Sequence, residues 1–162
     1  MNIVLHEPEI PQNTGNIART CAATGSKLHL IKPLGFETDD KSLKRAGLDY
    51  WHELDITYYE NFEDFMAKND NPTVYMSTTK AQNLYADCNY AKNSFIMFGK
   101  ESKGIPENIL VNHKPTTIRI PMKEGQRSLN LSNAVCIVLF EALRQNNFES
   151  MQLQSALPLL KD

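Results

Sequence analysis

A chain of 162 residues, 41% of them hydrophobic and 22% charged, is long enough to bury a continuous core without a metal or disulfide. Its formal net charge of −2 gives no sign of a nucleic-acid partner, although phosphate binding needs only one basic face. We expect one domain spanning residues 1–162, in which residues 147–162 form a C-terminal tail.

The sequence argues against membrane and metal-dependent classes of protein. Its longest uninterrupted apolar run, residues 134–140, is far shorter than the roughly 20 residues that a membrane-spanning helix needs. The N-terminus lacks the basic and apolar regions of a secretory signal. The three cysteines have no C-x-x-C spacing and the four histidines are scattered, so we expect no zinc site. We therefore expect a cytoplasmic protein without a bound metal.

Strand-like runs alternate with helix-like segments along most of the chain. The runs rich in β-branched, aromatic or leucine residues are 2–6, 28–31, 56–59, 73–77, 94–98 and 116–120. Helices are expected from Asn13, a good N-cap residue, to just before Gly25, and at residues 39–46 and 62–68. This alternation predicts an α/β fold, with a mostly parallel sheet and helices on both faces.

A last helix is predicted from Leu131 to Leu143, where apolar residues follow the i, i+3, i+4, i+7 spacing for three turns. Its apolar surface is widened by Cys136, Ile137 and Phe140 beyond what one sheet face would cover. Either a partner subunit or the interior of the same domain would bury the remainder.

Three polar, glycine-containing segments are candidates for a ligand site. They are the loop of residues 98–106, which contains Gly99 and Gly104, the segments 120–122 and 127–133, and residues 13–19. In an open parallel sheet, ligands bind where strands end, and two of these segments directly follow predicted strands. No G-x-G-x-x-G follows the first strand and no P-loop motif occurs, which argues against the classical dinucleotide and P-loop folds.

Together these segments resemble the SPOUT superfamily of RNA methyltransferases, and most closely its TrmL (YibK) type, which methylates the ribose 2′-hydroxyl of the wobble nucleotide of certain tRNAs. The resemblance runs from about Asn2 to Asn146 and includes residues 8–11 and 45–50. It implies a C-terminal trefoil knot, S-adenosylmethionine as the methyl donor, and a homodimer that binds tRNA. The target implied is position 34, cytidine or a 5-modified uridine, of leucine isoacceptors.

The resemblance assigns cofactor binding to one group of residues, which contact the cofactor largely through backbone groups of three loops. These residues are Ser77, Gly99, Glu101, Ile120 and Ser128. Each also has a purely structural interpretation: Gly99 could shape a turn, Ile120 could be a core residue and Ser128 could cap the last helix. Glu101 could instead orient a neighbouring loop or a substrate hydroxyl, or simply be solvated.

The catalytic residues implied by the resemblance are Arg19, Asn13 and Asn130. Arg19 occupies the arginine position of the family motif Asn13-x-Gly15-x-x-x-Arg19. A guanidinium is a poor proton acceptor and a good phosphate clamp, so we expect Arg19 to position the substrate while the proton leaves to phosphate or water. Asn13 and Asn130 could equally be helix caps.

Other functions remain compatible with the sequence. The same fold and cofactor could serve another RNA position, and a non-catalytic knotted paralogue could bind RNA; a generic nucleotide-binding α/β enzyme is a further alternative. Basic clusters that could contact phosphate are Lys41 with Lys44 and Arg45, Lys100 with Lys103, and Lys123 with Arg127. The family often has tyrosine at the position of Phe140, so a hydrogen bond from that position is lost here.

Overall fold

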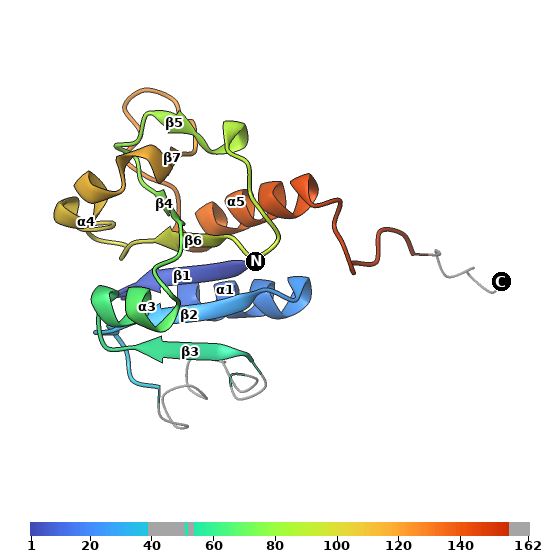
Figure 1. The fold of residues 1–162 in the computed structure, drawn as a ribbon, viewed down its shortest axis with the longest axis horizontal. Helices are drawn as coiled ribbons and strands as arrows, with labels where there is room; N and C mark the ends of the chain where they lie inside the picture. The colour runs from blue at the N-terminus through green and yellow to red at the C-terminus, as the bar shows by residue number, and fades with distance from the viewer. Residues whose placement is uncertain (39–50, 52–53, 156–162) are drawn as a thin grey trace.

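The computed structural model describes residues 1–38, 51 and 54–155 (Figure 1). The predicted helix at residues 39–46, the motif at residues 45–50 and the basic cluster of Lys41, Lys44 and Arg45 lie outside the described residues.

A seven-stranded sheet forms the centre of the described structure, with the order β3-β2-β1-β6-β4-β7-β5. Each neighbouring pair of these strands is parallel, as the sequence predicted. The strands are β1 (Asn2–His6), β2 (Lys27–Ile31), β3 (Ile56–Tyr59), β4 (Val74–Ser77), β5 (Asn83–Leu84), β6 (Phe95–Phe98) and β7 (Thr117–Arg119). Strand β5 was not predicted, because two residues are too few for a periodic signal.

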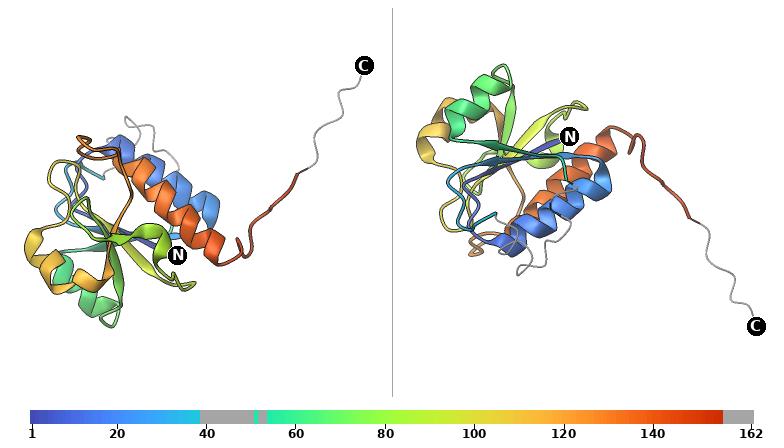
Figure 2. Two further views of the ribbon diagram at one scale, coloured as in Figure 1. Left: turned by 90° about the horizontal axis from the view of Figure 1, so that it is seen from above. Right: turned by 90° about the horizontal axis from the view of Figure 1, so that it is seen from below.

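Helices cover both faces of the sheet, which confirms the predicted layers (Figure 2). One face carries α1 (Pro11–Thr24) and α5 (Leu131–Gln145), which lie side by side, and the other carries α3 (Phe62–Lys68) and α4 (Glu107–Asn112). Short 3-10 turns occur at Tyr85–Asp87 and Lys114–Thr116. Helix α4 was not predicted, since it spans little more than one turn and a half.

Two hydrophobic cores lie on opposite faces of the sheet. Ile3 and Leu5 of β1 contribute to the core beneath α1 and α5, whereas Val4 contributes to the core beneath α3 and α4. This alternation follows from the period of two in a strand. Because β1 is buried on both sides, its sequence is almost continuously apolar rather than alternating.

The helix ends mostly follow the capping signals in the sequence. Asn61 caps α3 by accepting a hydrogen bond from the Asp64 backbone N–H, and Gly25 ends α1 in the left-handed conformation with φ 65°. Helix α1, however, begins at Pro11, a residue whose fixed φ suits the first helical position. The prediction that Asn13 caps this helix is therefore wrong.

The outer surface of α5 is open in this structure. Ile137 and Phe140 are 36% and 44% exposed, so the described part of the domain does not bury them. On the inner side, Thr20 of α1 lies 3.5 Å from Cys136 of α5 through their side-chain oxygen and sulfur atoms. After α5 the chain leads away from the sheet (Figure 2), and Leu153 is 69% exposed. No helix among the described residues is long and apolar enough to cross a membrane.

Candidate active site

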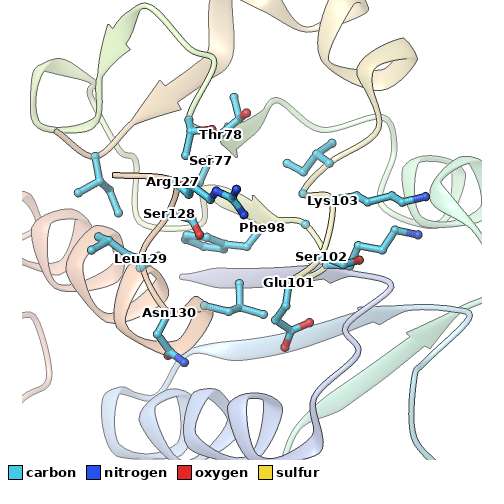
Figure 3. Close-up of a pocket in the computed structure, with 18 of the residues that line it drawn as sticks. Ser77, Thr78, Phe98, Glu101, Ser102, Lys103, Arg127, Ser128, Leu129 and Asn130 are labelled. Carbon is cyan, nitrogen blue, oxygen red and sulfur yellow. The ribbon is translucent and has the colours of Figure 1, made fainter. Parts of the chain in front are cut away.

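A cavity of about 620 Å³ opens at the edge of the sheet where β4, β6 and β7 end (Figure 3). Its walls come from the loops that follow these strands, from the first turn of α1 and from the start of α5. The carboxyl ends of neighbouring parallel strands meet at one edge, which is where ligands bind in open α/β sheets. The volume lies within the range of small-molecule and cofactor sites, about 300–1,000 Å³.

The structure brings nearly all the predicted site residues together at this cavity. Those that line it are Asn13, Ser77, Gly99, Glu101, Ile120, Ser128 and Asn130. Arg19 does not line the cavity and is exposed on α1. It follows Asn13 by six residues, about 9 Å along the helix axis.

The loop after β6 requires glycine at position 99. A Cβ atom there would lie 2.0 Å from the carbonyl carbon of Gly104, because the loop folds back on itself. The Gly104 N–H donates to the Lys100 carbonyl at 2.8 Å, and Gly104 has φ +71°, which favours glycine. Gly99 therefore does shape a turn, and the Gly104 backbone packed against it leaves no room for a side chain.

Glu101 connects this loop to the segment before α1. Its carboxylate accepts hydrogen bonds from the backbone N–H of Glu9 at 2.8 Å and of Ile10 at 3.3 Å. It also accepts one from the Asn13 side-chain amide at 2.9 Å. The N-cap residue of α1, Ile10, has no side chain that could cap, so Glu101 brings the acceptor and the negative charge that a helix N-terminus favours.

Further pairs tie the same two segments together. The Lys100 ammonium contacts the Glu7 carboxylate at 2.5 Å, which raises the pKa of Lys100. Ser102 donates to Glu9 through its backbone N–H at 2.9 Å and its hydroxyl at 2.7 Å, and these bonds lower the pKa of Glu9. The loop after β6 is thus held at several points against the segment before α1. All the hydrogen bonds of the Glu101 side chain are made to this segment and to Asn13.

Asn130 links α5 to this network. Its side-chain oxygen caps α5 by accepting from the backbone N–H of Ser132 at 3.0 Å and of Asn133 at 3.3 Å. It also accepts from the Ser132 hydroxyl at 2.6 Å. Its amide nitrogen donates to the Asn13 side-chain oxygen at 3.0 Å. The helix-cap interpretation of Asn130 is confirmed, and the same residue lines the cavity.

The loop after β4 completes the wall, although little in the sequence indicated its residues. Thr78, Thr79 and Lys80 line the cavity directly after Ser77. The Thr78 N–H donates to the Ile118 carbonyl at 2.9 Å, and Arg119 donates to the carbonyl of Thr79. Their position after a predicted strand was the only signal that could have found them.

Positive side chains surround the cavity, but they differ in whether they are neutralised. Lys80 pairs with Glu107 at 2.7 Å, as Lys100 pairs with Glu7. Lys103 and Arg127 also line the cavity and form no ion pair within the described part of the chain (Figure 3). These two are the cations available to an anionic ligand. Among the described residues, no group of His, Cys, Asp and Glu side chains could hold a metal ion.

Comparison with known proteins identifies the family. Residues 1–140 match the SpoU rRNA methylase family. A tRNA (cytidine(34)-2′-O)-methyltransferase from Yersinia pestis is 46% identical over 160 residues, which cover 95% of this chain and 99% of that protein.

Solved structures give the same result. A structure described as giving insight into the 2-OH methylation of C/U34 on tRNA has a TM-score of 0.83 and 41% identity, covering 90% of this chain and 95% of that one. An AdoMet-bound rRNA methyltransferase from Sinorhizobium meliloti has a TM-score of 0.75 and 29% identity, covering 95% of this chain and 57% of that one.

The parallel sheet with a cavity at its carboxyl edge is thus that of an α/β methyltransferase. The chain belongs to the SpoU methylase family, within the SPOUT superfamily. Its structural neighbours in that family imply the trefoil knot in the C-terminal part of the fold.

Proposed function

We propose that this protein transfers a methyl group from S-adenosylmethionine to the ribose 2′-hydroxyl of nucleotide 34 in tRNA, and that it acts as a homodimer. The observation that carries the proposal is the cavity, where seven of the eight candidate site residues meet in a chain of this family. The similarity to tRNA (cytidine(34)-2′-O)-methyltransferases over almost the whole chain supports the choice of substrate.

The cavity suits S-adenosylmethionine in its size and its lining. Phe98 and Ile120 give apolar walls against which an adenine ring can pack, and Ser77 and Ser128 add polar groups at the rim. Gly99 lines the cavity, where its backbone groups can contact a ligand. We propose that Ser77, Gly99, Ile120 and Ser128 hold the cofactor.

The cofactor, when bound, contributes a methyl group on a good leaving group: the oxygen–methyl bond forms, the sulfur–methyl bond breaks, and its electron pair stays on sulfur. What the protein must contribute is alignment of a weak nucleophile with that methyl group. The hydroxyl proton passes to water or to a phosphate oxygen. Asn13 and Asn130 lie at the cavity wall, where they can contact the ribose.

Arg19 fits this scheme only if a second copy of the chain is present. It lies outside the cavity of its own chain, on the exposed side of α1, next to α5 with its exposed Ile137 and Phe140. We propose that these residues form the interface between copies and that Arg19 positions the substrate in the partner's cavity. A guanidinium binds phosphate in a bidentate manner, which suits this role.

The tRNA itself would contact the cavity rim through the unpaired cations Lys103 and Arg127. We propose leucine isoacceptors with cytidine or a 5-modified uridine at position 34 as the substrates, on the basis of the resemblance to the TrmL type. Residues 1–146 would act as one methyltransferase domain in the cytoplasm, with the later residues as a tail.

The test is to incubate the purified protein with S-adenosylmethionine and unmodified leucine tRNA, digest the RNA, and search for 2′-O-methylcytidine and 2′-O-methyluridine by mass spectrometry. We expect methylation at nucleotide 34, and its loss in Arg19→Ala without loss of cofactor binding. A tRNA in which nucleotide 34 is already 2′-O-methylated is the matched control. Cofactor binding with no methylation of tRNA would contradict the proposed substrate.

A further inference from the structure

The hydrogen bonds that join Glu101, Asn13 and Asn130 have a fixed direction, and it is set from both ends. At one end, the ionised Glu101 carboxylate can only accept, and it already accepts from the backbone N–H groups of Glu9 and Ile10. The Asn13 group that faces it at 2.9 Å must therefore be the amide nitrogen. The Asn13 oxygen is then turned toward Asn130.

At the other end, the backbone N–H groups of Ser132 and Asn133 can only donate. They fix the Asn130 oxygen at the start of α5, so the Asn130 amide nitrogen faces Asn13. The two assignments agree, because this nitrogen meets the Asn13 oxygen at 3.0 Å. Neither carboxamide can be turned over without placing two acceptors or two donors against each other.

This arrangement decides what the two asparagines can offer a substrate. The Asn130 oxygen accepts three hydrogen bonds and the Asn13 oxygen accepts one, from Asn130, while each amide group has two N–H bonds and uses one of them in the network. Both residues line the cavity, and Figure 3 shows Asn130 and Glu101 along the same side of it. Each of the two amides therefore keeps one N–H that it can donate to a ligand in the cavity.

Free N–H donors suit an oxygen that becomes more negative during the reaction. The ribose 2′-oxygen gains negative charge as its proton leaves, and fixed N–H donors stabilise such charge at little reorganisation cost. We propose that Glu101 is a positioning residue that fixes the direction of this chain, so that Asn13 and Asn130 donate hydrogen bonds to the 2′-oxygen and neither accepts its proton. This inference rests on the proposed function, and it moves Glu101 from cofactor binding to positioning.

The direction of the chain can be reversed by isosteric changes. In Asn130→Asp, the new carboxylate still caps α5, but it places an acceptor against the Asn13 oxygen. In Glu101→Gln, the new side-chain oxygen can still accept from Asn13, whose orientation Asn130 continues to fix, but the new amide nitrogen then faces the Glu9 N–H, which loses its acceptor. In the double variant the side chains can run the other way: the new amide nitrogen at position 101 donates to Asn13, which donates to the new carboxylate at position 130. The Ile10 N–H shares the Glu101 oxygen that faces Asn13, at 3.3 Å, so its bond is the one that the reversed chain loses.

Two readouts test the proposal. In thermal unfolding, each single variant is expected to lower the melting temperature. The double variant is expected to recover much of the loss, since the bonds between the three side chains are matched again and only the 3.3 Å bond from Ile10 is missing. In methylation assays, Asn130→Asp and the double variant are both expected to lose about 100-fold or more in kcat, because a donor to the 2′-oxygen is missing. The KM for tRNA and the Kd for S-adenosylmethionine should change little. Ser132→Ala removes one bond to the same Asn130 oxygen without reversing the chain, and is expected to retain near wild-type kcat.

Additive losses of melting temperature would overturn the directional chain. Wild-type kcat in Asn130→Asp would overturn the role as donors. In Glu101→Gln, kcat should fall at every pH without a shift of the pH profile, whereas loss of the acidic limb of the profile would identify Glu101 as the base and overturn its positioning role. If the wild-type protein methylated no tRNA, the proposed function would fail, but the unfolding data would still decide the direction of the chain.

Discussion

The cavity wall and the outer face of α1 and α5 are built on opposite principles. At the wall, hydrogen bonds of 2.9 Å and 3.0 Å join Glu101 to Asn13 and Asn13 to Asn130. On the outer face, Arg19 is exposed and Ile137 and Phe140 show large apolar side chains to solvent. The hydrogen bonds of the wall are made within one chain, whereas the exposed apolar side chains of the outer face are typical of a surface that binds another protein.

This difference suggests how the two regions divide the work. Groups that must hold a reacting atom are fixed by bonds within the chain, since catalysis depends on donors that do not reorganise. Arg19, which we propose positions the substrate, lies instead on the open face. We therefore expect activity to depend on assembly, and cofactor binding to depend on the single chain.

The largest effect should follow from charge on the outer face. Phe140→Asp places a carboxylate where an apolar contact between copies is proposed, so the dimer should dissociate and methylation should fall by about 100-fold or more. Light scattering coupled to size exclusion reports the mass. The matched control is Val111→Asp on α4, which replaces an apolar side chain that is 56% exposed on the other side of the sheet and should leave the mass unchanged. A monomeric wild-type protein with full activity would contradict the proposal that the outer face of α1 and α5 is a dimer interface needed for activity.

A smaller effect is expected at the cavity loop. Gly99→Ala puts a methyl group 2.0 Å from the Gly104 backbone, so the loop must open, with a loss of about 3 kcal/mol in the free energy of unfolding. Cofactor affinity, measured by calorimetry, should fall with it, while the dimer persists. Gly104→Ala is the comparison: its methyl group would meet no atom within 4 Å, and only its φ of +71° is unfavourable, which costs about 1 kcal/mol. Equal losses in the two variants would argue against the tight loop.

The smallest effect concerns a buried polar group outside both regions. His29 is buried, with its ring nitrogens 2.8 Å from the Tyr59 hydroxyl and 3.2 Å from the Asn2 side-chain oxygen, and burial lowers its pKa to about 4. The unfolded chain takes up a proton near pH 6.5 and the folded one does not. The stability that neutral His29 contributes is therefore present above pH 6.5 and is lost as the pH falls toward 4.

Between pH 7 and pH 5 this loss amounts to about 2 kcal/mol in the free energy of unfolding. Urea unfolding at the two pH values should show that the free energy of unfolding changes less with pH in His29→Gln than in the wild type. Part of the change should remain, because burial also lowers the pKa of His6. Equal slopes in the wild type and His29→Gln would contradict this account.

The sequence predicted the sheet better than it predicted the site. Strands such as β3 and helices such as α3 were found to the residue, because apolar runs and an N-cap at Asn61 are local signals. Helix α4 was missed because it contains only six residues.

At the site, the sequence identified Asn13, Glu101 and Asn130, but it could not show that they contact one another. Glu101 and Asn13 are 88 positions apart, and Asn13 and Asn130 are 117 positions apart. Such a network depends on three-dimensional packing, for which no local pattern exists. The same applies to Arg19, whose residue type indicated phosphate binding while its distance from the cavity became visible only in the fold.

The most direct test of the claim that Arg19 acts in the partner's cavity is to mix two inactive variants, Arg19→Ala and Asn130→Ala. Methylation of tRNA is then assayed after subunit exchange. If Arg19 acts in the partner's cavity, each mixed dimer has one intact site, and roughly a quarter of wild-type activity should return. If the mixture is as inactive as its components, although mass measurements show mixed dimers, Arg19 acts within its own chain and the account is contradicted.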